Sequence, residues 1–190
     1  FSFFINARKT SVVCRNHDYL LISDEIMVEW NYYEIRPTIN LKIGNLSMSS
    51  VVFSKEEIIA QRKRVSITTT SKAVFPQTTN HHDTLFGGTA MQWMDEIAFI
   101  AATRFSRQTI VTVSSDKIDF KHPVPAGTVV ELTASVVEVG RTSLKVEVNM
   151  MVESMYLDDQ KNAITGYFTF VAVDENKKPT SIIPLTLVVE

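Results

Sequence analysis

The segment from Thr89 to about Arg104 constrains the fold more than any other part of this 190-residue chain. Its composition predicts a helix whose surface is apolar on nearly every side. At about 100° per residue, the only polar stripe on that helix is a narrow one, formed by Gln92, Glu96 and Thr103. A helix of this kind belongs inside a fold, so other elements of the chain must cover it.

Four segments that follow this helix alternate between apolar and polar side chains, which is typical of half-buried antiparallel strands. They lie at about residues 109–121, 127–139, 142–153 and 164–173. The short gaps between them predict a meander of neighbouring strands, with a tight hairpin at Gly140-Arg141. A further strand is expected over 65–70, before the helix. The pattern predicts an α+β fold in which an antiparallel sheet of about five strands wraps around one central helix.

Residues 1–47 differ from the rest of the chain because they carry no motif and show no sustained alternation. We expect an N-terminal extension here, outside the native domain, and a single domain over residues 48–190. Within the extension, residues 18–22 and 39–43 are candidate strands. Ser54, followed three residues later by Glu57, predicts a capped helix start, and this helix should reach about Arg62.

The composition excludes several classes of protein. Hydrophobic residues make up 45% of the chain and charged residues 21%, with a net charge of -2, as in ordinary globular domains. This charge gives no reason to expect nucleic acid or an anionic membrane as a partner, and no apolar run approaches the roughly 18 residues of a membrane span. The single cysteine, Cys14, excludes an internal disulfide and a cysteine-based zinc site. We expect a cytoplasmic protein.

Asp95 is the first candidate for chemistry, because it lies on the shoulder of the polar stripe with apolar neighbours beside it. A partly desolvated carboxylate is a stronger base, so Asp95 could activate water as a general base. It could equally be a surface carboxylate paired with a lysine or arginine. Position alone leaves both interpretations open.

Two further features precede the helix. The loop Asn80-His81-His82-Asp83 offers a neutral amide at Asn80 that can hold a water or a carbonyl. Its two histidines have no further ligand nearby at metal-site spacing, so we expect no metal. Gly87-Gly88 opens the helix, where free N–H groups and the helix dipole favour developing negative charge. No G-x-S-x-G nucleophile motif is present, so hydrolysis here would use activated water directly.

Taken together, these residues resemble the signature of hotdog-fold acyl-CoA thioesterases of the acyl-CoA hydrolase type. The resemblance covers about residues 49–185 and excludes the first 46. Its specific part combines Leu85-Phe86-Gly87-Gly88 with Trp93-Met94-Asp95-Glu96, and the pieces that support it in the family's order are Lys121-His122-Pro123-Val124, Gly140-Arg141-Thr142-Ser143 and Phe170-Val171-Ala172-Val173-Asp174. One departure is Asp83, which stands where many members of the family have glycine.

The resemblance implies a hotdog fold and a role for each matching residue. Asp95 would be the general base, Asn80 would orient the water or the substrate, and the Gly88 N–H would face the developing oxyanion. Asn80 of one subunit would serve Asp95 of another, within a dimer and a hexamer built as a trimer of dimers. The expected contacts to substrate, including the coenzyme A portion, are those of Gly87, His82, Lys117, Lys121, Arg141, Thr142 and Ser143. No cofactor is implied besides the coenzyme A of the substrate.

We therefore expect an enzyme that hydrolyses acyl-CoA to a free fatty acid and coenzyme A. Two alternatives stay open. The first is a non-catalytic acyl-CoA-binding protein of the same fold, which would need no base. The second is a hotdog hydratase or dehydratase, for which His82 ahead of Asp95 leaves room. Only a thioesterase releases free coenzyme A, so a thiol-release assay separates the three.

Overall fold

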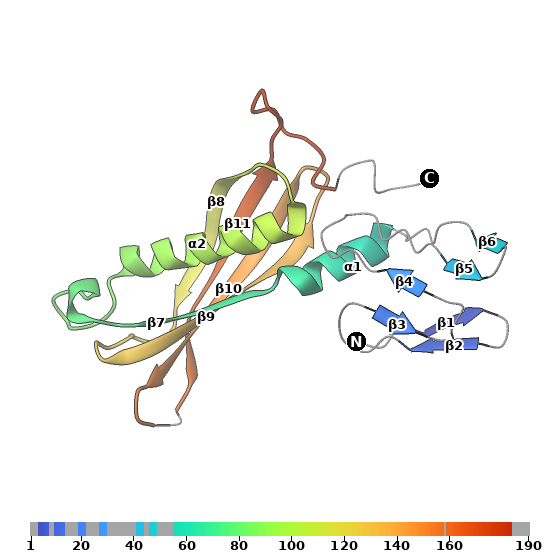
Figure 1. Ribbon diagram of the computed structural model, residues 1–190. Helices are drawn as coiled ribbons and strands as arrows, with labels where there is room; N and C mark the ends of the chain where they lie inside the picture. The colour runs from blue at the N-terminus through green and yellow to red at the C-terminus, as the bar shows by residue number, and fades with distance from the viewer. Residues whose placement is uncertain are drawn as a thin grey trace. The chain divides into compact units, whose positions relative to one another are not determined.

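A computed structural model describes residues 55–157 and 159–183, together with six short strands between residues 4 and 48. Ser54, expected to cap the first helix, and Cys14 lie outside the described residues. The chain divides into two compact units, residues 55–185 and residues 1–54 with 186–190. The first of these units carries the long helix and the large sheet (Figure 1).

The sheet has five antiparallel strands in the order β7-β9-β10-β11-β8. Their bounds are Thr68–Ala73 (β7), Ile110–Phe120 (β8), Thr128–Val139 (β9), Ser143–Ser154 (β10) and Lys161–Ala172 (β11). The four strands expected after the helix are all present. The expectation that they form one meander is wrong for β8, which pairs with β11 and not with β9. The chain from β8 to β9, which contains Pro123 and Pro125, therefore crosses to the far side of β10.

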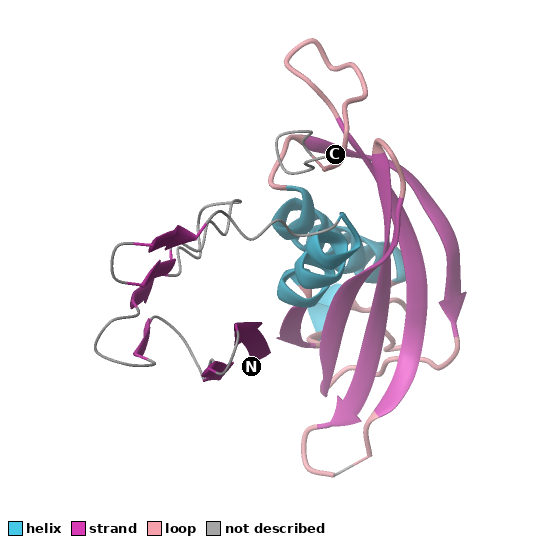
Figure 2. Cartoon of the chain, turned by 90° about the vertical axis from the view of Figure 1, so that its right-hand side faces the viewer, coloured by secondary structure: helices cyan, strands magenta, loops and turns pink. Residues whose placement is uncertain are grey.

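The alternation within the strands places one set of side chains on the helix-facing side of the sheet. Leu144, Val146, Val148 and Met150 of β10 are at most 1% exposed, as their period-2 spacing predicted. Figure 2 shows both helices on this face of the curved sheet. A Cβ added to Gly166 in β11 would lie 2.9 Å from Met94 Cε, so a glycine there lets helix and sheet approach closely.

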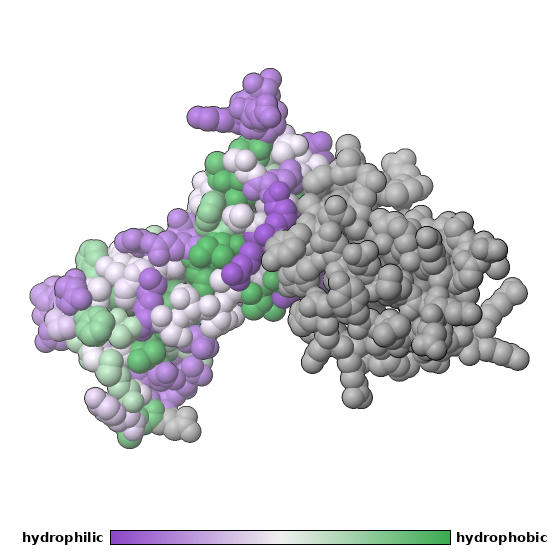
Figure 3. Space-filling view, viewed as in Figure 1, coloured by the Kyte–Doolittle hydropathy of each residue, from purple (hydrophilic) through white to green (hydrophobic). Residues whose placement is uncertain are grey.

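The long helix, α2, covers Gly87–Ser106 and is central to the unit, as expected. Ala90, Met94, Ile97, Ala98 and Ala101 lie at 1% exposure or less. The helix is not covered all round, however. Several apolar side chains of α2 and the neighbouring edge strand β8 are 39–55% exposed in the single chain, namely Met91, Phe99, Ile100, Val111 and Val113. Figure 3, which has the viewpoint of Figure 1, shows apolar side chains among polar ones on the described part of the side that carries α2.

The first helix, α1, covers Lys55–Ser66 and packs against α2. It is longer than predicted, and the strand expected over 65–70 begins only at Thr68 in β7. Tertiary contacts explain the difference, because Arg62 donates hydrogen bonds to the carbonyls of Phe105 (3.0 Å) and Ser106 (3.3 Å) at the end of α2. These bonds hold the last turns of α1 helical although β-branched Val65 favours a strand.

The other unit contains three two-stranded hairpins. Their strands are Phe4–Ala7 (β1), Thr10–Val13 (β2), Tyr19–Leu21 (β3), Met27–Glu29 (β4), Leu41–Ile43 (β5) and Leu46–Met48 (β6). The candidate strands at 18–22 and 39–43 coincide with β3 and β5. We predicted that residues 1–47 are an extension outside the native domain, and this stays a prediction.

Candidate active site

The start of α2 presents backbone N–H groups without helical acceptors. Phe86 is the N-cap residue and its side chain makes no capping hydrogen bond. The Ala90 N–H donates to the Phe86 carbonyl at 3.0 Å, so the N–H groups of Gly87, Gly88 and Thr89 precede the first bond of the helix. They lie at the positive end of the helix dipole. This geometry suits a negatively charged oxygen.

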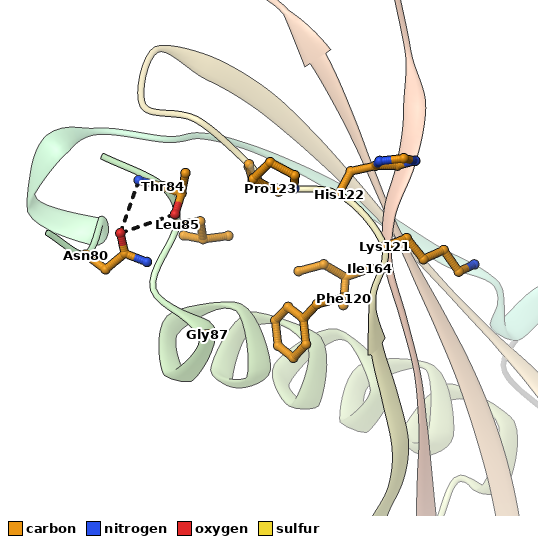
Figure 4. Close-up of a pocket in the computed structure, with 10 residues that line it drawn as sticks. Asn80, Thr84, Leu85, Gly87, Phe120, Lys121, His122, Pro123 and Ile164 are labelled. Atoms are coloured by element: carbon orange, nitrogen blue, oxygen red, sulfur yellow. Dashed lines mark hydrogen bonds between the residues drawn. The ribbon is translucent and has the colours of Figure 1, made fainter. Parts of the chain in front are cut away.

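The loop before α2 is organised around the side chain of Asn80. Its Oδ1 accepts a hydrogen bond from the His82 N–H at 2.8 Å. It also accepts from the Thr84 N–H at 3.4 Å and the Thr84 hydroxyl at 3.2 Å (Figure 4). The carbonyl oxygen is therefore committed to the turn, and the Nδ2 amino group remains as the donor for a ligand. Asp83 has a φ of 55°, the left-handed region in which glycine is most at ease.

A cavity of about 290 Å³ lies between this loop, the start of α2 and the end of β8 (Figure 4). Its walls join polar groups with apolar side chains. The lining residues are Asn80, Thr84, Leu85, Gly87, Phe120, Lys121, His122, Pro123, Val124 and Ile164. The structure thus brings together the loop amide of Asn80 and the glycine start of α2.

Asp95 lies two turns further along α2 and is half-buried. Its Oδ1 accepts a hydrogen bond from the Thr112 hydroxyl at 3.3 Å. Thr112 stands opposite Phe170 of β11 in register, on the side of the sheet that faces α2. Thr112 was not predicted as a site residue from the sequence. One indication was available in the sequence. Thr112 is a polar residue that follows the inward-facing Ile110 by two strand positions, so both side chains are expected on the same face of the sheet.

Asp95 and the cavity residues are separate within one chain. Asp95 does not line the cavity, and it follows Gly87 by eight residues, or about 12 Å along a helix axis. One chain therefore holds two halves of a site. The first half is the loop of Asn80 with the N-terminus of α2, and the second is the Asp95–Thr112 pair.

The two lysines predicted to contact substrate are Lys121, which lines the cavity, and Lys117, which lies in β8. The Lys121 ammonium donates to the Thr165 hydroxyl at 2.9 Å, and Figure 4 shows its side chain pointing away from Asn80. Lys117 lies in an irregular part of β8, where its φ is 27°, and it pairs with Asp119 at 3.1 Å. Both lysines thus have partners within the sheet.

The His82 side chain is exposed, and its ring lies 3.9 Å from that of His81. The predicted hairpin at Gly140-Arg141 closes through a bond from the Gly140 N–H to the Ser143 carbonyl at 2.8 Å, and the Arg141 side chain is exposed. Among the described residues, no group of three or more His, Cys, Asp or Glu side chains is placed to hold a metal ion.

The described helices include none that is long and apolar enough to cross a membrane.

On the outer face of the sheet, the Tyr167 hydroxyl donates to Glu147 at 2.7 Å. This hydrogen bond, and then the charge of the Glu147 carboxylate, raise the pKa of Tyr167.

Comparison with known proteins identifies the class to which this fold and site belong. Residues 82–157 match the model of the thioesterase superfamily. An uncharacterized acyl-CoA thioester hydrolase of Bacillus subtilis, YkhA, is 40% identical over 120 residues, which cover 63% of this chain and 69% of the relative. A second such protein, from Zymomonas mobilis, is 39% identical over 58% of this chain and 74% of its own length.

Solved structures agree. The acyl-CoA hydrolase from Staphylococcus aureus, in complex with butyryl coenzyme A and coenzyme A, has a TM-score of 0.60 and 37% identity, over 63% of this chain and 73% of that one. A hexameric acyl-CoA thioesterase has a TM-score of 0.61 and 34% identity, over 63% and 76%. The chain belongs to the hotdog-fold acyl-CoA thioester hydrolases, as its motifs predicted.

Proposed function

We propose that this chain hydrolyses acyl-CoA to a free acid and coenzyme A, with Asp95 as the general base and no metal. The observation that carries this proposal is the half-buried carboxylate of Asp95, oriented by the Thr112 hydroxyl at 3.3 Å. A fixed carboxylate on a central helix can take a proton from water. Nothing in the described structure favours the hydratase or the non-catalytic alternative.

The proposed reaction follows from these groups. The Asp95 carboxylate removes a proton from water, and the resulting hydroxide forms a bond to the thioester carbonyl carbon. The carbonyl oxygen takes up the negative charge, which the Gly88 N–H stabilises. When the oxyanion collapses, the carbon–sulfur bond breaks and the coenzyme A thiolate receives the proton held by Asp95. Asn80 orients the water or the substrate through its Nδ2 amino group.

Variants of the S. aureus enzyme support this choice of residues. Separate solved structures replace an asparagine, an aspartate and a threonine of that enzyme by alanine. The intervals between the replaced positions are 15 residues (43 - 28) and 17 residues (60 - 43). Asn80, Asp95 and Thr112 are separated by the same intervals, 95 - 80 and 112 - 95. We therefore propose that the three residues act in one site.

The helix geometry favours a site shared by two copies of the chain. Gly88 and Asp95 are seven residues apart, or about 10 Å along α2. One reacting carbonyl must lie near 3 Å from the oxyanion donor and beside the activated water, so a single α2 cannot supply both groups. We propose that Asn80 and Gly88 of one copy act with Asp95 of another. The unpaired edge of β8 and its exposed apolar side chains would face the second copy.

We propose that the turn at Gly140–Ser143 binds the coenzyme A portion of the substrate. In this proposal Arg141 contacts a phosphate, and Thr142 and Ser143 add hydrogen bonds. Lys117 and Lys121 are weaker candidates, because each ammonium already has a partner in the sheet. The known assembly of a similar thioesterase is a hexamer, which supports a homo-oligomer built from dimers. A rat relative named as cytosolic, 30% identical over 29% of its length, supports a cytoplasmic location.

A thiol-release assay with a panel of acyl-CoA substrates tests the proposal. We expect free coenzyme A from the wild-type protein and a loss of at least about 100-fold in kcat for Asp95→Asn. Glu96→Gln is the matched control, because the neighbouring Glu96 is exposed and bonded to Gln92 at 2.9 Å. Wild-type turnover in Asp95→Asn would reject the assignment and leave Asp95 as a surface carboxylate.

A further inference from the structure

The turn at Gly140–Ser143, here named the coenzyme A turn, is held in place by three backbone hydrogen bonds. The Gly140 N–H donates to the Ser143 carbonyl at 2.8 Å, and the Ala172 N–H donates to the Thr142 carbonyl at 2.9 Å. The third bond comes from outside the neighbouring strands, since the Ile182 N–H donates to the Arg141 carbonyl at 2.9 Å. The orientation of the Arg141–Thr142 peptide therefore depends on a segment about 40 residues later.

This segment, residues 180–183, is named the strap. It returns from β11, where the Thr180 N–H donates to the Ala172 carbonyl at 2.9 Å. Ile182 and Ile183 are 1% and 3% exposed, so the strap is part of the core and not a loose tail. It contacts the coenzyme A turn through backbone atoms, which leaves the Arg141 side chain exposed.

Gln108 fastens the strap to the end of α2. Its Nε2 donates to the carbonyls of Ser181 and Ile182, each at 2.9 Å. Both hydrogens of the amide are used, so no other side chain type of this length reproduces the contact. Gln108 follows Arg107, which ends α2 in the left-handed conformation with a φ of 55°. A continuous series of hydrogen bonds thus runs from Gln108, at the end of α2, through the strap to the coenzyme A turn.

The geometry of the peptide group links this chain of contacts to ligand binding. In a trans peptide the carbonyl and the N–H point in opposite directions. When the Ile182 N–H holds the Arg141 carbonyl, the Thr142 N–H points away from the strap. A donor presented there, beside the exposed Arg141 side chain, suits a phosphate oxygen.

We propose that Gln108 is a positioning residue for coenzyme A recognition, acting through the strap on the coenzyme A turn. The inference rests on the proposed function, which assigns the turn to coenzyme A. Gln108 touches no reacting atom, so its loss weakens binding of the nucleotide portion and leaves the chemical step unchanged. An acyl-pantetheine thioester has no nucleotide and does not depend on the turn.

The test compares Gln108→Met, which keeps the side-chain length and removes both donors, with the wild-type protein. We expect KM for an acyl-CoA to rise about five- to tenfold, because the variant loses the two hydrogen bonds that hold the strap. We expect kcat to stay unchanged, because Gln108 touches no reacting atom. The Kd for free coenzyme A, measured by calorimetry, should rise by the same factor. KM for the matching acyl-pantetheine should not change. Gln61→Met on α1 is the control, because this glutamine contacts Arg64 on the same helix.

Three results would overturn the inference: an unchanged Kd for coenzyme A, an equal loss with both substrates, or a fall in kcat alone. If Gln108→Met does not fold, Gln108→Asn serves instead, since its shorter amide cannot reach both carbonyls. A wild-type protein that binds coenzyme A but hydrolyses no thioester would count against the proposed function only. The calorimetric comparison would still decide the role of Gln108.

Discussion

Replacing Thr112 with valine should slow thioester hydrolysis without weakening the fold. Valine has nearly the shape of threonine, but it cannot donate the 3.3 Å hydrogen bond to Asp95 Oδ1. Hydrogen bonds to charged groups contribute about 1.5–3 kcal/mol, and this one is long and solvent-exposed, so the lower end of that range applies. A loss of about 1.5 kcal/mol corresponds to a roughly tenfold lower kcat.

The assay is steady-state release of free thiol from an acyl-CoA, with kcat and KM determined separately. Because Thr112 orients the base and does not hold the substrate, we expect kcat to fall and KM to stay the same. Thr112→Ser keeps the hydroxyl and should retain most of the activity. Thr133→Val provides a matched control on the other face of the sheet, where the Thr133 hydroxyl forms a hydrogen bond with that of Thr69 at 3.1 Å.

A wild-type kcat in Thr112→Val, in a protein with unchanged Tm and oligomeric state, would refute this reasoning. It would mean that the Asp95 carboxylate is oriented by other groups in the working enzyme. An equal loss in Thr112→Ser would also contradict the account, because the serine hydroxyl can make the same bond.

Two predictions concern stability. Arg62→Met removes two hydrogen bonds to the carbonyls that end α2, so we expect a loss of about 2–3 kcal/mol in the free energy of unfolding and a Tm lower by roughly 5–15 °C, with the control Gln61→Met on the same helix nearly unchanged. A Tm drop no larger than that of the control would contradict this role. The raised pKa of Tyr167 means that the folded state holds its proton more tightly, so this stabilisation is complete below about pH 10 and is lost as the pH rises through the folded pKa. Urea titrations at increasing alkaline pH should show that the free energy of unfolding falls more steeply for the wild-type protein than for Tyr167→Phe. Identical pH profiles for the two proteins would refute this contribution of Tyr167.

The sequence was sufficient to predict the elements of the fold because their patterns are local. The alternation from Leu144 to Met150 defines β10 and its buried face without reference to any other strand. The apolar surface of the helix after Gly88 likewise predicts its central place. Strand order is not local. Nothing between Phe120 and Thr128 shows that the chain crosses from one side of the sheet to the other, since a hairpin of similar length would carry the same residues.

The candidate site likewise contains some residues that the sequence identifies and others that only the structure identifies. Asn80, Gly88 and Asp95 stand out in the sequence because each has a motif or an unusual neighbourhood. Thr112 does not, because its role depends on a strand pairing that places it beside α2. Gln108 is also invisible in sequence, since its partners in the strap follow more than 70 residues later. Lys121 illustrates a different limit: the family resemblance implied a ligand contact for it, but only the structure shows that its ammonium donates to Thr165.

The most direct test of the shared site is a mixing experiment with two inactive variants. Asp95→Asn removes the base, and Asn80→Asp removes the Nδ2 donor while keeping the oxygen that accepts from His82 and Thr84. Random reassociation makes half of the dimers hybrid, and each hybrid contains one intact site out of two. The mixture should therefore regain about a quarter of wild-type thiol release. If hybrids form, as native mass spectrometry would show, and no activity returns, the two halves of the site do not come from different copies.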